Sequence, residues 1–231
     1  MKSKIRSFIK KYPTLEKYVF LLKNGSSKTL KIIKGENNRL IINSSAILKN
    51  CTFDIVGNSN EIIIHESCVF NNTTFFIRGN SNKIHIDTHV QFNRGGSIWI
   101  EDANCEASIG AHSTFEDVHI AVTEPHSKIT IGTDCMFAYD IDIRSGDSHS
   151  IIDATTNKRI NYAQNVIIGN HVWVASHVSI LKGVTIGNNS VIATRSVVTK
   201  SFETDNNLIG GMPAKIIKEQ INWDRKRIYE K

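Results

Sequence analysis

A six-residue period runs without a break from residue 165 to residue 200 and constrains the fold more than any other feature. The segment reads NVIIGN HVWVAS HVSILK GVTIGN NSVIAT RSVVTK. A period of six fits neither a single helix nor an ordinary strand, whereas three hexads form one turn of a triangular coil. Each hexad then supplies a short strand and a corner, so the period predicts a solenoid of parallel strands. The residues expected to point into the stack are Ile168, Val174, Ile180, Ile186, Ile192 and Val198.

A second period, of 22 residues, precedes the hexads. GENNRLII begins at Gly35, GNSNEIII at Gly57 and GNSNKIHI at Gly79. The next coil is expected near residue 101, and a later one at 124 is one residue out of step. We interpret 22 residues as three hexads plus a corner in which Gly and Asn tolerate the positive φ of a tight turn. Inward side chains are predicted at Ile62, Ile64, Phe70, Phe75, Ile77, Ile84, Ile86 and Phe92, and an amide ladder at Asn38, Asn60, Asn82 and Asn104.

Three motifs carry a resemblance to a known family. They are GDSHSI at residues 146–151, the hexads with Trp173, and GGMPAKIIK at residues 210–218. With these motifs the chain resembles the hexapeptide-repeat acyltransferases, which fold as left-handed parallel β-helices and use acyl-CoA. The resemblance is greatest to O-acetyltransferases of bacterial capsules, lipopolysaccharides and small sugars. It implies an all-β solenoid, a left-handed parallel β-helix, assembled as a homotrimer with active sites between subunits.

The chain is expected to have three parts. Residues 1–28 form a basic N-terminal helical cap, because apolar residues recur there at helical spacing. Residues 29–212 form the β-helix, which a polar active-site loop at 145–164 interrupts. Residues 213–231 are expected to form a C-terminal helix.

The net charge of +6 is concentrated at the N-terminus. Residues 1–34 hold ten Lys and Arg against one acid, Glu16. Nucleic acid is not expected as a partner, since no recognition motif accompanies the charge. A solvated face of the capping helix is the favoured interpretation, and contact with anionic lipid or an acidic polysaccharide is the alternative. Without a signal peptide or a membrane span in the sequence, we expect a cytoplasmic location or one peripheral to the inner face of the membrane.

The motif GDSH places a histidine in a corner that continues into a polar excursion, SIIDATTNKRINYAQ. Counting back 22 residues from His149 gives Ser127, then the Asn positions of earlier corners. A loop that orders many residues without adding core is best explained by binding. The resemblance implies that His149 is the general base, that Trp173 walls the acceptor or acetyl group, and that Asp147 or a backbone carbonyl orients the imidazole.

The resemblance also implies a site for acetyl-CoA in the C-terminal coils. A backbone N–H near Ala175 and Ser176 would stabilise the oxyanion, and Ala193 and Thr194 would line the path of the pantetheine arm. A basic group at the mouth of the site suits a ligand that carries several phosphate charges. No metal is expected, because His171 and His177 lack a convincing third ligand. The remaining residues expected to contact the cofactor are Thr199, Lys200, Lys215 and Lys218.

We therefore predict an acetyl-CoA-dependent O-acetyltransferase that acts by direct attack on a bacterial cell-surface polysaccharide or its sugar precursor. An N-acetyltransferase of a nucleotide-linked amino sugar is the alternative within enzymes. A non-catalytic β-helix scaffold that binds glycans is the alternative outside them, and it would be indifferent to loss of His149.

Overall fold

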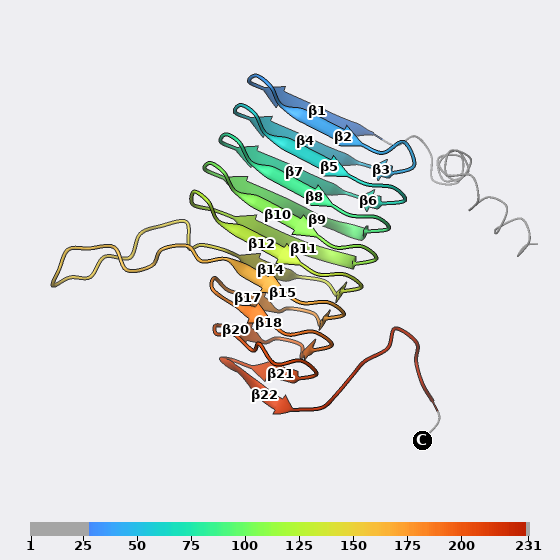
Figure 1. Ribbon diagram of the computed structural model, residues 1–231, viewed down its shortest axis with the longest axis vertical. Helices are drawn as coiled ribbons and strands as arrows, with labels where there is room; N and C mark the ends of the chain where they lie inside the picture. Colours follow the sequence, from blue (N-terminus) through green and yellow to red (C-terminus); the bar gives the residue numbers. More distant parts are fainter. Residues whose placement is uncertain (1–27, 230–231) are drawn as a thin grey trace, which may run out of the picture.

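Parallel strands stacked in successive coils make up the described part of the chain (Figure 1). The computed structural model describes residues 28–229, so the predicted N-terminal cap lies almost wholly outside the described residues. Strand pairing joins residues 22 positions apart in most of the long coils, as in Thr52 with Thr74, and 18 apart in the hexads, as in Trp173 with Val191. The predicted parallel β-helix is confirmed.

Each coil contributes one strand to each of three faces. We number the faces in the order in which the chain follows them after β1. Face 1 is a sheet of seven strands. Its strands are β2 (Arg39–Ile42), β5 (Glu61–Ile64), β8 (Lys83–Ile86), β10 (Glu106–Ile109), β12 (Lys128–Ile131), β15 (Val166–Ile168) and β18 (Thr185–Ile186).

Faces 2 and 3 share one continuous sheet, because β9 (Gln91–Glu101) and β11 (Thr114–Val122) run around the corner between them. Face 2 otherwise consists of β3 (Ile47–Lys49), β6 (Val69–Asn71), β13 (Met136–Phe137), β16 (Trp173–Val174), β19 (Val191–Ile192) and β21 (Leu208–Gly211). Face 3 otherwise consists of β1 (Thr29–Lys34), β4 (Cys51–Val56), β7 (Thr73–Arg78), β14 (Ile141–Arg144), β17 (Ser179–Ile180) and β20 (Val197–Val198).

The core is a set of inward columns, one residue from each coil. All eight inward positions predicted from the 22-residue period and all six from the hexads are at most 1% exposed. Phenylalanine rings stack along the axis, with centroids 4.4 Å apart for Phe92 and Phe115 and 4.7 Å apart for Phe115 and Phe137. Such stacking adds to the free energy of burying each ring.

The four cysteines are buried free thiols in these coils. Burial raises the pKa of three of them, Cys68, Cys105 and Cys135, to about 11. These three thiols therefore remain protonated near neutral pH.

The amide ladder follows the prediction for three of its four members. The backbone N–H of Asn60 donates to Asn38 Oδ1 at 3.0 Å, and that of Asn82 donates to Asn60 Oδ1 at 3.0 Å. The next donor is Cys105 N, at 2.8 Å from Asn82 Oδ1, so Asn104 is not the fourth member. An extra residue in β9 is the cause, because Lys83 pairs with Glu106, 23 positions on. The one-residue step therefore precedes residue 101 and does not fall between 101 and 124.

Glycine is required where consecutive corners approach closely. Gly79 has φ +139°, and a Cβ there would lie 1.7 Å from the carbonyl oxygen of Asp102. The recurring glycines of the 22-residue period thus reflect backbone contact between coils.

The end of the chain differs from the sequence prediction. Residues Ala214–Lys218 form strand β22, which pairs antiparallel with β21, and no residue from 213 to 229 is helical. The predicted C-terminal helix is therefore wrong. The exposed edge of β21 offers unpaired backbone groups, and β22 satisfies them. Between residues 28 and 229 no helix exists that could cross a membrane.

The phenylalanine columns give a stability prediction. We expect Phe115→Ala to lower the free energy of unfolding by about 3–5 kcal/mol, because it removes a fully buried ring that has stacking partners on both sides. Chemical denaturation of the variant and the parent measures this. Glu116→Ala, on the same strand but at the surface, is the control, and we expect it to change stability by less than about 1 kcal/mol. Equal losses for both variants would contradict this description of the core.

Candidate active site

The polar loop leaves the solenoid at the corner between faces 3 and 1. The chain departs after β14 and returns at β15, and it projects from one side of the solenoid (Figure 1). Gln164 N donates to Ser145 O at 2.8 Å and closes the base of the loop. Ile129 pairs with Val166, 37 positions on, so Gln164 occupies in this coil the position that Ser127 holds in the previous one. The alignment of His149 with Ser127 is therefore wrong, since His149 lies within the insertion.

Three side chains hold the first half of the loop. Asp147 accepts hydrogen bonds at Oδ2 from Lys182 Nζ and from Asn161 Nδ2, the latter at 2.8 Å. Asn161 Nδ2 also donates to His149 O at 2.8 Å. Lys182 lies in the corner after β17, so the loop is tied to the next coil of the solenoid.

A second contact joins the returning half of the loop to the preceding coil. Arg159 donates through Nη1 to Glu124 Oε2 at 3.0 Å and forms an ion pair with Oε1 of the same carboxylate. This pairing with two oxygens fixes the guanidinium in the plane of the carboxylate. The loop is thus anchored at both of its halves.

The electrostatics of this anchor favour an ionised Asp147. Partial burial works to raise its pKa, but hydrogen bonds from Lys182 and Asn161 and the charges of Lys182 and Arg159 lower the pKa overall. The carboxylate therefore stabilises the loop above the ordinary carboxyl pKa. That stabilisation is lost as the pH falls through the lowered pKa of Asp147.

His149 itself is exposed near the start of the loop. Its backbone N–H donates to Asp147 O at 2.7 Å, but its ring has no hydrogen-bond partner within residues 28–229. Asp147 does not contact the imidazole, because its carboxylate is engaged by Lys182 and Asn161. Asp147 thus shapes the loop and does not orient the ring in this chain.

Trp173 lies on the outer side of face 2, in β16, and is 36% exposed. Its neighbours in the same outward column are Met136 above and Val191 below. In a triangular coil two faces meet at each corner, and the third face lies opposite that corner. The corner that carries the His149 loop is therefore opposite face 2, and a single chain does not bring His149 and Trp173 together.

Four of the predicted cofactor residues gather at the corner between faces 2 and 3. Ala175 N donates to Ile192 O at 2.9 Å, and Ala193 N donates to Ile209 O at 2.8 Å, so the two alanines follow one another along the axis. Thr194 Oγ1 and Arg195 N donate to Ser176 O at 2.8 and 3.0 Å. Small side chains at this corner leave the backbone open to a ligand.

The predicted basic group is divided between two places. Lys215 and Lys218 are exposed on β22, beside the alanine corner, since a Cβ on Gly210 would meet both Ala193 and Ile217. Thr199 and Lys200 are exposed after β20, at the corner between faces 3 and 1. Lys200 Nζ lies 5.6 Å from the centroid of the Phe202 ring.

A C-terminal tail, residues 219–226, contributes contacts that the sequence motifs did not indicate. Trp223 is 8% exposed and stacks on His171 with ring centroids 4.2 Å apart, while its Nε1 donates to His171 O at 2.8 Å. The same indole lies 6.1 Å from the Trp173 ring. The partners of Trp223 and Arg225 on the solenoid lie 50 to 113 positions earlier in the chain, so no local sequence motif marks these contacts.

His171 and His177 each contact a carboxylate of the preceding coil. His171 Nδ1 lies 2.7 Å from Asp134 Oδ2, and His177 Nδ1 lies 2.6 Å from Asp140 Oδ2. Among residues 28–229 no group of three His, Cys, Asp or Glu side chains is arranged to hold a metal ion.

Comparison with known proteins gives a family match and two extensive structural matches. A family model described as bacterial transferase hexapeptide (six repeats) matches residues 165–200. The crystal structure of the polysialic acid O-acetyltransferase OatWY superposes with a TM-score of 0.82 at 35% identity, over 88% of this chain and 94% of that one. The polysialic acid-specific acetyltransferase NeuO superposes with a TM-score of 0.76 at 33% identity, over 86% and 89%.

Curated sequences give a shorter match. A polysialic acid O-acetyltransferase of Neisseria meningitidis is 44% identical over 124 residues, 54% of this chain and 57% of the relative. Another from Escherichia coli O1:K1 / APEC is 47% identical over 117 residues, 51% of this chain and 38% of the relative. The matched stretches thus span about half the length of these curated relatives.

The hexad β-helix with a polar loop at one corner defines a bacterial transferase of the hexapeptide-repeat class. On the identity and coverage of its match to the OatWY structure, the chain belongs to the hexapeptide-repeat acyltransferase family.

The anchoring of the loop gives a prediction. We expect Lys182→Ala to accelerate chymotrypsin cleavage after the exposed Tyr162 about two- to fivefold, because the ion pair with Asp147 is lost. Limited proteolysis followed by mass spectrometry measures the rate. Lys158→Ala removes an exposed lysine of the same loop and is the control. If both variants are cleaved at the parental rate, Lys182 does not anchor the loop.

Proposed function

We propose that the protein is an O-acetyltransferase that transfers acetyl from acetyl-CoA to a hydroxyl group of polysialic acid or a similar anionic capsular polysaccharide. The observation that carries the proposal is the extent of the structural match to two polysialic acid acetyltransferases, which includes the solenoid and most of the chain. The anchored loop with an exposed imidazole, and the exposed indole on face 2, supply the two groups that such a site needs.

His149 is proposed as the general base. Neutral imidazole accepts the proton of the acceptor hydroxyl as its oxygen attacks the thioester carbonyl. The C–O bond forms, the C–S bond breaks, and the proton passes to the departing thiolate. The free ring nitrogens of His149 suit this role, since no side chain of the described residues engages them.

The acetyl-CoA site is proposed at the corner of Ala175 and Ala193. The backbone N–H of Ser176 would donate to the oxyanion, since that of Ala175 is bonded to Ile192 O. The small side chains leave room for the pantetheine arm. Lys215 and Lys218 on β22 would attract the phosphates. Lys200 and Thr199, at the next corner along face 3, would belong to the same site only through a neighbouring subunit or an extended ligand.

A homotrimer with sites between subunits is part of the proposal, and the separation of His149 and Trp173 within one chain supports a site that subunits share. His149 of one chain can meet Trp173 only of a neighbouring chain, since the corner that carries His149 lies opposite the face that carries Trp173. The loop also presents apolar side chains to solvent, which a neighbouring subunit would cover. The exposed fractions are 55% for Ile151, 48% for Ile152, 62% for Ile160 and 59% for Tyr162.

The base assignment predicts the effect of one substitution. We expect His149→Asn to lower kcat by about 10²- to 10⁴-fold, while calorimetry still detects acetyl-CoA binding, because the ring acts only in the chemical step. His126→Asn, an exposed histidine at the same corner of the preceding coil, serves as the control. Near-parental turnover by His149→Asn would refute the assignment.

The shared site predicts complementation between inactive chains. Co-expressed His149→Asn and Trp173→Ala chains should form mixed trimers in which some sites combine an intact His149 with an intact Trp173. Specific activity should therefore rise above that of either variant alone. Differentially tagged, co-purified trimers test this. If mixed trimers are as inactive as the single variants, the two residues do not meet across a subunit boundary.

A further inference from the structure

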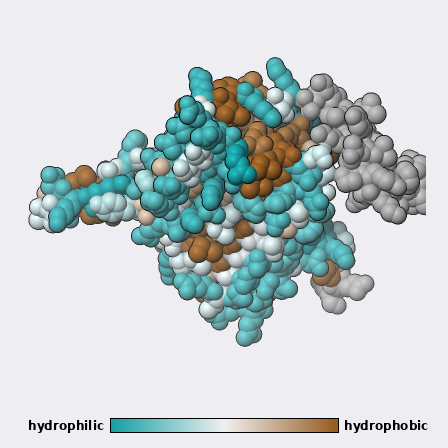
Figure 2. All heavy atoms as spheres, turned by 45° about the horizontal axis from the view of Figure 1, so that its top comes forward, coloured by the Kyte–Doolittle hydropathy of each residue, from teal (hydrophilic) through white to brown (hydrophobic). Residues whose placement is uncertain are grey.

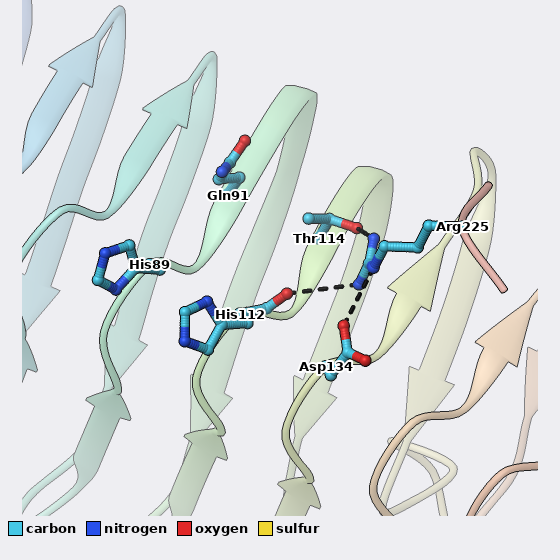
Figure 3. A pocket seen from close by; sticks show the side chains of 6 residues that line it. All are labelled: His89, Gln91, His112, Thr114, Asp134 and Arg225. Atoms are coloured by element: carbon cyan, nitrogen blue, oxygen red, sulfur yellow. Dashed lines mark hydrogen bonds and ion pairs between the residues drawn. The ribbon is translucent and has the colours of Figure 1, made fainter. Parts of the chain in front are cut away.

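A groove of about 430 Å³ lies on face 2 beside its corner with face 1 (Figure 3). The proposed transfer reaction does not use it. Its side chains come from three successive coils and from the C-terminal tail. The lining residues are His89, Gln91, His112, Thr114, Asp134 and Arg225.

Two histidines present unused hydrogen-bond donors on one side of the groove. The rings of His89 and His112 stack with centroids 4.8 Å apart and planes 21° apart, and both residues are exposed. Neither ring forms a hydrogen bond within residues 28–229, and Figure 3 shows both rings pointing to the same side. Imidazole N–H groups are suitable donors to a carboxylate oxygen, and an ionised imidazole forms the stronger hydrogen bond.

Arg225 enters the groove from the C-terminal tail. Its Nε donates to Asp134 Oδ1 at 3.0 Å, and its Nη1 donates to Thr114 Oγ1 at 2.8 Å. Its Nη2 donates to Cys135 O at 2.9 Å and to His112 O at 3.4 Å. Of the five N–H groups of a guanidinium, one on Nη1 is left for a ligand.

Asp134 is the only acidic side chain that lines the groove among the described residues. Desolvation works to raise its pKa, but hydrogen bonds from His171 and Arg225 lower the pKa overall. Its carboxylate is thus committed to these two partners. The groove therefore offers donors and lacks a free acceptor carboxylate, which suits an anionic ligand.

The groove lies on the same face as Trp173. Gln91 pairs with Thr114, Thr114 with Met136, and Met136 with Trp173, so all four occupy one outward column of face 2. Adjacent strands are about 4.8 Å apart, which places Thr114 about 10 Å from the level of Trp173. The tail connects the two places, because Trp223 packs near Trp173 and Arg225 follows two residues later.

We propose that this groove is a distal acceptor subsite that binds the carboxylate of one sugar residue of an anionic polysaccharide while another residue of the same polymer lies against Trp173. The proposal rests on the proposed acetyl transfer to such a polymer. His89, His112 and the remaining N–H of Arg225 donate to the carboxylate. The subsite makes the protein select long acceptors, since a short one cannot reach both places.

The test replaces both histidines, as His89→Asn/His112→Asn. Asn189 and Asn206 hold the corresponding corner in later coils with φ of 55° and 65°, so this corner accepts asparagine. We expect the KM for a long oligosialic acid to rise about tenfold, the effect of losing one or two charge-assisted hydrogen bonds. The KM for a sialic acid dimer should change far less. The control is His65→Asn/His85→Asn, which alters an exposed histidine pair on face 1, where the two Nε2 atoms lie 2.9 Å apart.

Several results would overturn the subsite. They are an unchanged KM for the long oligomer, an equal rise for long and short acceptors, or the same rise in the face 1 control. The test separates this proposal from the proposed function by direct titration with long oligosialic acid. If the parent protein transfers no acetyl group but binds the oligomer, and the double variant binds it at least tenfold more weakly, the subsite stands and the function fails. Equal binding by both proteins overturns the subsite.

Discussion

Hydrogen bonding between successive coils is the constraint on which the whole molecule depends. Strands of the interior coils take their partners from the coil before and the coil after, so equivalent residues stack in columns along the axis. The phenylalanine stack and the Asn38–Asn60–Asn82 ladder are two such columns. A single extra residue in β9 moves Asn104 out of the ladder, because the backbone N–H that then faces Asn82 Oδ1 is that of Cys105.

The same constraint decides where chemistry can be inserted. An insertion of many residues within a strand would interrupt pairing on both sides, whereas a corner can open into a long loop and resume in register. The chain does this between Ser145 and Gln164, whose backbone groups still bond across the opening. Because that corner lies opposite face 2, the geometry that preserves the solenoid also separates the loop histidine from Trp173. An assembly of several chains is the simplest way to reunite them.

The fold was largely predictable from the sequence, because the six-residue period indicates which residues face inward. Every inward position predicted from the repeats is buried. What escaped prediction lies outside the period. Residues 214–218 were predicted to be helical, and they lie outside the repeats. They form a strand because they pair with the free edge of β21. Lys182, which holds Asp147, and Trp223, which packs on His171, were missed because folding alone brings them to partners 35 and 52 positions away.

The C-terminal tail shows how a segment without secondary structure can organise a repetitive surface. A solenoid face repeats at every coil, so the backbone by itself gives a polymer no preferred position along the axis. The tail breaks this symmetry by crossing several coils: Asn206 Nδ2 donates to Ile221 O at 2.9 Å, Trp223 packs on His171, and Arg225 bonds to Thr114. It thereby marks one stretch of face 2, from Trp173 to the groove, as different from the rest. A long acceptor that binds this stretch would be held in one register relative to the proposed reaction centre.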